Sequence, residues 1–124
     1  MTKKVFISYD FADKSFKGEV AKWLKEEGVR VISTDENDLR PQGENAIERK
    51  IREEVKSAQK MLILVGNNTH NRPWIDYEIS IAGSLQMPRF WVRLPKRTGA
   101  PPKEVRGNIR QLNYNKEDIL FALR

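Results

Sequence analysis

The chain of 124 residues contains no cysteine and one histidine, His70. Without cysteine there can be no disulfide, no thiol nucleophile and no cysteine-ligated zinc. A single histidine also cannot build a histidine-rich metal centre, so we expect neither a metal site nor a bound cofactor. The lack of thiols fits a reducing compartment, and we expect a cytoplasmic protein.

Long apolar runs are also missing. No run is long enough to span a bilayer, and the start passes from Lys3 and Lys4 directly into a strand-like run, unlike a signal peptide. Charged residues make up 32% and hydrophobic residues 39%, which is typical of a globular protein. This length suits one folding unit, so we expect a single domain over residues 1–124.

Basic residues are unevenly placed. Residues 87–112 contain one acid, Glu104, and enough basic residues to carry the whole net charge of +6: Arg89, Arg93, Lys96, Arg97, Lys103, Arg106 and Arg110. Such a segment is either a solvated surface loop or a site for a phosphate-bearing ligand or nucleic acid. Its aromatic pair, Phe90 and Trp91, fits a strand better than an exposed stacking surface, so nucleic-acid binding is not expected.

Apolar strands alternate with amphipathic helices along the chain. Residues 5–9, 29–32, 61–65 and 90–94 read as strands, and residues 109–112 as a weak fifth strand. Helical spacing of apolar residues marks four helices, within residues 16–24, 47–58, 73–85 and 119–123. The pattern predicts a flavodoxin-like, doubly wound α/β fold: one three-layer domain with a parallel sheet of four to five strands, covered on both faces. Ligands of such sheets bind beyond the carboxyl ends of the strands.

Glu78 stands out in the helix that Pro73 is placed to begin. At about 100° per residue, it falls near the middle of an apolar arc, flanked by Trp74, Ala82 and Leu85. A carboxylate in a core-facing arc is costly unless it is paired or hydrogen-bonded. Three explanations remain open: a buried ion pair, a helix rotated so that Glu78 meets water, or a catalytic carboxylate on the floor of a cleft.

The motifs, in their order, resemble those of TIR domains over most of residues 4–86. The resemblance rests on the opening strand 5–9, on a long loop with turn residues, on the strand 61–65, and on a helix that carries a Trp and a Glu. The matching residues are Pro41, Gly43, Ile47, Ile51, Ser57, Trp74, Glu78 and Ile79. The chain most resembles compact prokaryotic TIR-like proteins of the Thoeris antiphage type. It departs from the general pattern near the last helix, where the usual Phe-Trp pair is absent.

The resemblance implies an activity and a site. Many TIR domains cleave the N-glycosidic bond of NAD, and Thoeris-type members are understood to make an ADP-ribose derivative that signals to a partner effector. NAD would be substrate, and Glu78 matches the essential Glu of the family. A carboxylate there would stabilise an oxocarbenium-like sugar or hold the ribose hydroxyls, and Glu78→Gln should abolish NAD consumption with little change in melting temperature. The residues expected to contact the nucleotide are Tyr9, Asp10, Phe11, Thr34, Arg40 and Trp74.

Two other functions stay open. A catalytically silent TIR module would act by self-association or by docking a partner. A nucleoside deoxyribosyltransferase-like enzyme would also use a Glu against an N-glycosidic bond, but it would consume deoxynucleosides and ignore NAD. A response-regulator receiver is disfavoured, because it needs an acceptor Asp after the third strand, where this chain has Gly66-Asn67-Asn68.

Overall fold

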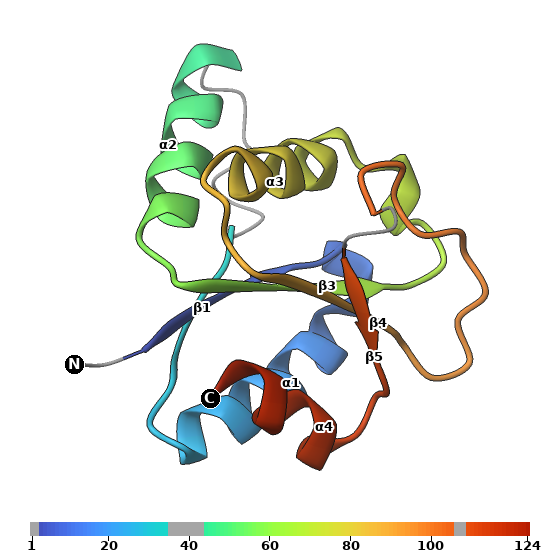
Figure 1. Cartoon of the computed structure of the whole chain (residues 1–124). Coiled ribbons are helices and arrows are strands. Elements are labelled where there is room, and N and C mark those ends of the chain that lie inside the picture. Colours follow the sequence, from blue (N-terminus) through green and yellow to red (C-terminus); the bar gives the residue numbers. More distant parts are fainter. Residues whose placement is uncertain (1–2, 35–43, 106–108) are drawn as a thin grey trace.

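A computed structural model describes residues 3–34, 44–105 and 109–124. Figure 1 shows the chain, and the expected loop residues Arg40, Pro41 and Gly43 lie outside the described residues. The strands are β1 (Lys4–Ser8), β2 (Arg30–Ile32), β3 (Lys60–Val65), β4 (Arg89–Arg93) and β5 (Arg110–Leu112). The helices are α1 (Lys14–Glu26), α2 (Glu44–Lys56), α3 (Pro73–Ser84) and α4 (Lys116–Leu123), with short 3₁₀ turns at Phe11–Asp13 and Thr69–Asn71.

The five strands form one parallel sheet in the order β2-β1-β3-β4-β5. This confirms the predicted fold class and the weak fifth strand. The strand order reverses direction between β1 and β3, the point at which ligands of doubly wound sheets bind. The register places Ser8 opposite Ile63 there, so the ends of β1 and β3 lie side by side.

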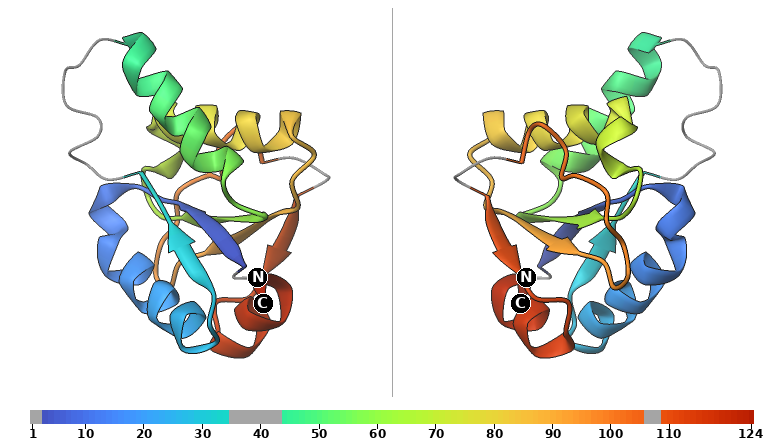
Figure 2. Two further views of the ribbon diagram at one scale, coloured as in Figure 1. Left: turned by 90° about the vertical axis from the view of Figure 1, so that its left-hand side faces the viewer. Right: turned by 90° about the vertical axis from the view of Figure 1, so that its right-hand side faces the viewer.

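Helices cover both faces of the sheet, with α1 and α4 on one face and α2 and α3 on the other (Figures 1 and 2). Side chains alternate along β1, so that Val5, Ile7 and Tyr9 enter the core under α1 and α4. Phe6 enters the core under α2 and α3, and Ser8 follows it on the same face. The two cores therefore give the sheet an apolar interior on each side.

The helix boundaries follow local chemistry. Gly28 stands just beyond α1 with φ 76°, the left-handed conformation that ends many helices. Pro73 occupies the first turn of α3, as expected, and the Thr69 hydroxyl accepts from the Gly66 N–H at 2.8 Å to brace the loop before it. One expectation was wrong. Leu85 does not complete the buried arc, because α3 ends at Ser84 and Leu85 is 43% exposed.

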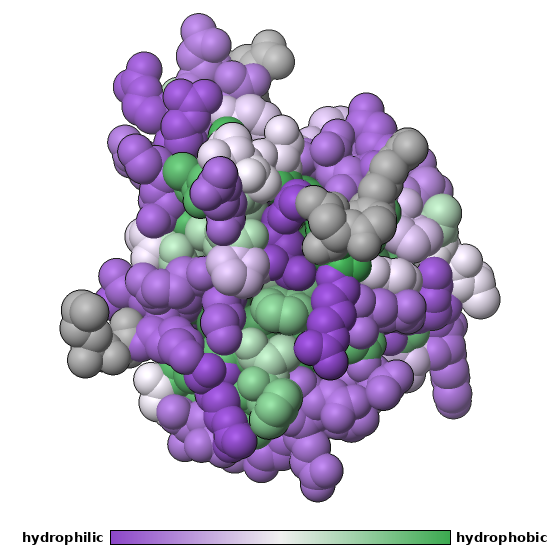
Figure 3. Space-filling model, in the orientation of Figure 1, coloured by the Kyte–Doolittle hydropathy of each residue, from purple (hydrophilic) through white to green (hydrophobic). Residues whose placement is uncertain are grey.

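Hydrophilic side chains cover most of the face shown in Figure 3, and the largest hydrophobic patches lie near its middle. Phe121 in α4 is the most exposed large apolar side chain among the described residues, at 74%. None of the described helices combines the length and apolar character needed to cross a bilayer.

Candidate active site at the carboxyl edge of the sheet

The carboxyl group of Glu78 lies buried at the carboxyl edge of the sheet, with 1% of the residue exposed. The hydroxyl of Ser8, at the end of β1, donates to its Oε1 at 2.8 Å. The hydroxyl of Thr34, just beyond β2, donates to its Oε2 at 2.6 Å. Glu78 takes part in none of the ion pairs found among the described residues, and it does not meet water. Two neutral hydroxyls therefore hold the carboxyl group, in place of a buried cation.

Burial raises the pKa of Glu78 to about 8, because a charged carboxylate loses its hydration in this position. The hydrogen bonds from Thr34 and Ser8 oppose that shift, since they favour the charged form, and the nearby charge of Glu54 adds to it. At pH 7 the neutral acid is therefore the major form. A positive charge brought beside the carboxyl group would lower its pKa and favour the anion.

An aromatic wall stands at the same edge. The ring of Phe11, in the turn after β1, stacks on the indole of Trp74 with centroids 5.1 Å apart and planes 15° apart. Tyr9 meets the edge of Phe11, with centroids 5.7 Å apart, but it packs in the core under α1 and α4. Phe11 and Trp74 are only partly buried, so these two rings form the accessible part of the wall.

A cation lies next to this wall. The Arg72 Nε lies 3.1 Å from the buried carboxylate of Asp10, and its guanidinium carbon lies 5.7 Å from the Trp74 ring centroid. The Arg72 side chain is 39% exposed, whereas that of Asp10 is 3% exposed. Asp10 thus fixes an accessible positive charge beside the aromatic pair.

A second carboxylate ties the following loops to this edge. Asp13 is buried, and its Oδ1 lies 3.5 Å from the Nε of Arg97, which comes after β4. Burial raises the pKa of Asp13, while its hydrogen bond and ion pair with Arg97 oppose the shift and the charge of Asp10 adds to it. A side chain at Gly66 would overlap the Asp13 carboxylate, so a larger residue there would have to displace that carboxylate.

A small hollow opens beside Trp74, between α2 and the start of α3. It measures about 270 Å³ and its lining residues are Ile47, Glu48, Ile51, Pro73, Trp74 and Tyr77. Apolar side chains make up most of the lining, which suits a planar ring better than a phosphate.

The structure brings together five of the seven expected site residues: Asp10, Phe11, Thr34, Trp74 and Glu78. Tyr9 joins them only through Phe11, and Arg40 lies outside the described residues. In the ranges that the structure describes, no three acidic or histidine side chains cluster closely enough to hold a metal ion.

Ser8 and Arg72 were missed in the sequence. Ser8 is the one small polar residue in the opening strand 5–9, and Arg72 directly precedes the Pro that starts α3. Either feature is a signal in retrospect. However, Ser8 and Glu78 are 70 residues apart in the chain, and Arg72 and Asp10 are 62 apart, so neither pairing was visible without the fold.

The parallel sheet in this strand order, with a Trp and a buried Glu on the helix after the third strand, fits the TIR-like class that the motifs resemble. The family model described as "Thoeris protein ThsB, TIR-like domain" matches residues 6–99, and the chain belongs to that family. A search of curated proteins found no match.

Solved structures share the fold at low sequence identity. The Hydra magnipapillata Toll-related receptor TRR-2 TIR domain aligns with TM-score 0.64 and 13% identity, over 96% of this chain and 90% of that one. The Clostridium botulinum CMP N-glycosidase BcmB aligns with TM-score 0.64 and 18% identity, over 96% of both chains. The TIR domains of the activated Roq1 resistosome align with TM-score 0.55 and 15% identity, over 74% of this chain and 57% of that one.

Proposed function

We propose that this protein cleaves the N-glycosidic bond of NAD and releases nicotinamide, with Glu78 as its essential carboxylate. The observation that carries the proposal is the buried Glu78 carboxyl group at the strand ends, held by the hydroxyls of Ser8 and Thr34. A structural carboxylate at such depth is ordinarily neutralised by a cation. A carboxylate that is buried with only neutral partners lowers the stability of the fold, and such costly residues are common in active sites.

The chemistry suits this arrangement. The bond between the ribose C1′ and the nicotinamide nitrogen breaks, and its electron pair stays on nitrogen, so nicotinamide leaves as a neutral molecule without needing an acid. The sugar is left as an oxocarbenium-like cation, which an adjacent carboxylate stabilises strongly in a water-poor site. Attack by water gives ADP-ribose and a proton, whereas attack by a nucleophile of the ADP-ribose itself, or of another molecule, gives a cyclic or conjugated product.

Neighbouring groups match the other parts of NAD. Arg72 offers an accessible guanidinium for the pyrophosphate, and the Phe11–Trp74 pair and the apolar hollow beside it offer surfaces for planar rings. The hydroxyls of Ser8 and Thr34 can rotate from Glu78 toward a ribose hydroxyl. Tyr9 and Arg40 remain part of the proposal only as expected neighbours of the nucleotide.

Incubation of the full chain with NAD, CMP and deoxynucleosides, followed by chromatography and mass spectrometry, tests this function. We expect nicotinamide from NAD and a product of ADP-ribose size. Glu78→Gln should lower the rate by at least about 100-fold. Glu53→Gln, which changes an exposed glutamate of α2, should keep the rate and serves as the matched control.

The other outcomes separate the rival functions. Consumption of deoxynucleosides alone would favour the deoxyribosyltransferase-like activity. Consumption of CMP alone would favour the activity named for the structurally similar BcmB. No turnover at high protein concentration would favour a silent TIR module that self-associates or docks a partner. If the enzyme is active, the mass of its product also identifies the kind of small molecule that could signal to an effector protein. Such a signal is the role that we propose for this protein in antiphage defence.

A further inference from the structure

A second hollow lies at the outer edge of the sheet, and neither Glu78 nor its hydroxyl partners Ser8 and Thr34 line it. It measures about 600 Å³ and lies between α1 and β2. Its lining comprises four basic residues, Lys17, Lys22, Lys25 and Arg30, together with Gly18, Ala21, Val29 and Val31. None of the described residues that line it is acidic. We call it the α1–β2 groove.

The charge of this groove follows from the two sides of α1. At about 100° per residue, Lys17, Ala21, Lys25 and Gly18 share one side of the helix. The acids lie on another side and are engaged there, since Glu19 accepts a hydrogen bond from Tyr114 at 2.7 Å. Lys17 and Lys25 therefore face the sheet edge on a side of α1 that carries no acid.

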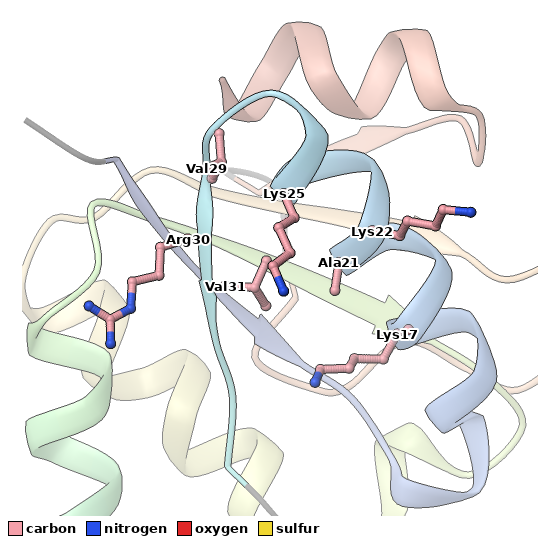
Figure 4. Close-up of a pocket in the computed structure, with 8 residues that line it drawn as sticks. Lys17, Ala21, Lys22, Lys25, Val29, Arg30 and Val31 are labelled. Atoms are coloured by element: carbon pink, nitrogen blue, oxygen red, sulfur yellow. The ribbon is translucent and has the colours of Figure 1, made fainter.

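Within the described residues, these cations have no ion-pair partner. Lys17 Nζ lies 5.8 Å from the centroid of the Tyr9 ring. In the part of the chain that the structure describes, no carboxylate forms an ion pair with Lys17, Lys22, Lys25 or Arg30. In Figure 4, Lys17 and Lys25 extend from α1 toward β2, while the head groups of Lys22 and Arg30 point outward on opposite sides. The groove thus has an apolar floor and a rim of positive charge.

The backbone of β2 adds hydrogen-bonding groups to this rim. β2 is an edge strand and pairs only with β1 among the described strands. Arg30 N–H donates to the Lys3 carbonyl, so Arg30 faces β1, and in a parallel ladder the next residue faces away. Val31 therefore turns its N–H and C=O toward the open edge of the sheet beside the groove, where no described strand pairs with them.

We propose that the α1–β2 groove binds an acidic, extended peptide segment of a partner protein, which adds as a strand beside β2 and places its carboxylates against Lys17 and Lys25. Edge strands commonly bind peptides in this way, with backbone bonds for affinity and side-chain pockets for selectivity. The side of α1 that lines the groove carries the small residues Gly18 and Ala21, and a Cβ at Gly18 would meet no atom within 4 Å. The groove therefore has room for an extended peptide. A second copy of this protein is a poor occupant, because its net charge is also +6.

The test uses the full chain and a capped hexapeptide of alternating glutamate and valine that carries a fluorophore. Fluorescence anisotropy should show saturable binding that weakens with salt. The same peptide with lysine in place of glutamate should not bind. A third peptide, with methylated backbone nitrogens on alternate residues, keeps its charge but should bind at least about tenfold more weakly, because it loses backbone donors.

Protein variants locate the site. Lys17→Glu with Lys25→Glu should weaken binding at least about tenfold. The control, Lys56→Glu with Arg124→Glu, makes the same change in net charge at exposed positions elsewhere and should keep most of the affinity. Binding of the glutamate peptide should also slow hydrogen exchange at the Val31 amide.

Several results would overturn the proposal. Equal loss in both double variants would mean that only net charge matters. Displacement of the peptide by millimolar inorganic phosphate at constant ionic strength would indicate a small-anion site. Unchanged exchange at Val31 would exclude strand addition, and a peptide-independent dimer lost only in the Lys17→Glu, Lys25→Glu variant would show that a second copy is the occupant.

Discussion

The sharpest consequence of the buried Glu78 is a pH-dependent cost to folding. The pKa of Glu78 rises from 4.5 to about 8 on folding, so the folded protein keeps a proton that the unfolded chain releases. The contribution of Glu78 to stability is therefore most favourable below pH 4.5 and falls as pH rises toward about 8, where both states are ionised and the loss levels off. Each pH unit between these limits costs about 1.4 kcal/mol, which amounts to about 3 kcal/mol at pH 7.

Glu78→Gln should remove this cost. The amide cannot ionise, and it stays hydrogen-bonded because the Ser8 and Thr34 hydroxyls can each donate or accept. The sequence alone suggests an unchanged melting temperature, but the burial of Glu78 predicts a pH-dependent difference. Between pH 4 and pH 7, the free energy of unfolding of Glu78→Gln should increase by about 3 kcal/mol relative to that of the parent.

Urea unfolding of both proteins at pH 4, 5, 6, 7 and 8 measures this difference. Comparing the two proteins cancels other titrating groups, such as Asp13 and Asp76, whose pKa values burial also raises. Glu53→Gln should show no such trend, because Glu53 is exposed. A stability difference between parent and Glu78→Gln that stays flat from pH 4 to pH 8 would refute the reasoning.

Three further predictions concern the surroundings of the carboxyl group. Alanine replacements of Phe11 and Trp74, singly and together, should show a coupling of about 0.5–1.5 kcal/mol in unfolding free energy, and additive effects would argue against their stacking. Gly66→Ala should lower stability by about 1–3 kcal/mol, because the added methyl group overlaps Asp13; an unchanged urea midpoint would contradict that close approach. Thr34→Val removes a donor to the buried carboxyl group and should raise its pKa, so the loss of stability should extend to higher pH; an unshifted profile would show that this hydrogen bond contributes little.

The fold was predictable because the helices and all strands except the weak fifth one carry clear local signals. The run from Met61 to Val65 is apolar throughout, as a strand buried on both faces must be, and it became β3. The position of Glu78 within an apolar arc was also predictable, since it depends only on helical geometry, but its burial was one of the alternatives that the sequence left open. The prediction that Leu85 is buried was wrong because helical geometry does not determine where a helix ends.

The partners of the site residues were not predictable. The hydrogen bonds from Ser8 and Thr34 to Glu78 form because the ends of β1 and β2 lie beside α3. No local sequence pattern encodes that arrangement. Likewise, the sequence shows Asp10 as a turn residue, but only the fold places Arg72 against it. Residue types and helix faces could be predicted from the sequence, whereas the electrostatic state of the carboxyl group depends on contacts made across the chain.

The central claim is that ionised Glu78 supports cleavage of the glycosidic bond. The most direct test is the value of kcat/KM for nicotinamide release from NAD between pH 5.5 and pH 9. Our account predicts that kcat/KM rises with pH and levels off near the pKa of about 8 in the free protein, and that Glu78→Gln has almost no activity at any pH. A profile without that rise, or substantial activity in Glu78→Gln, would contradict it.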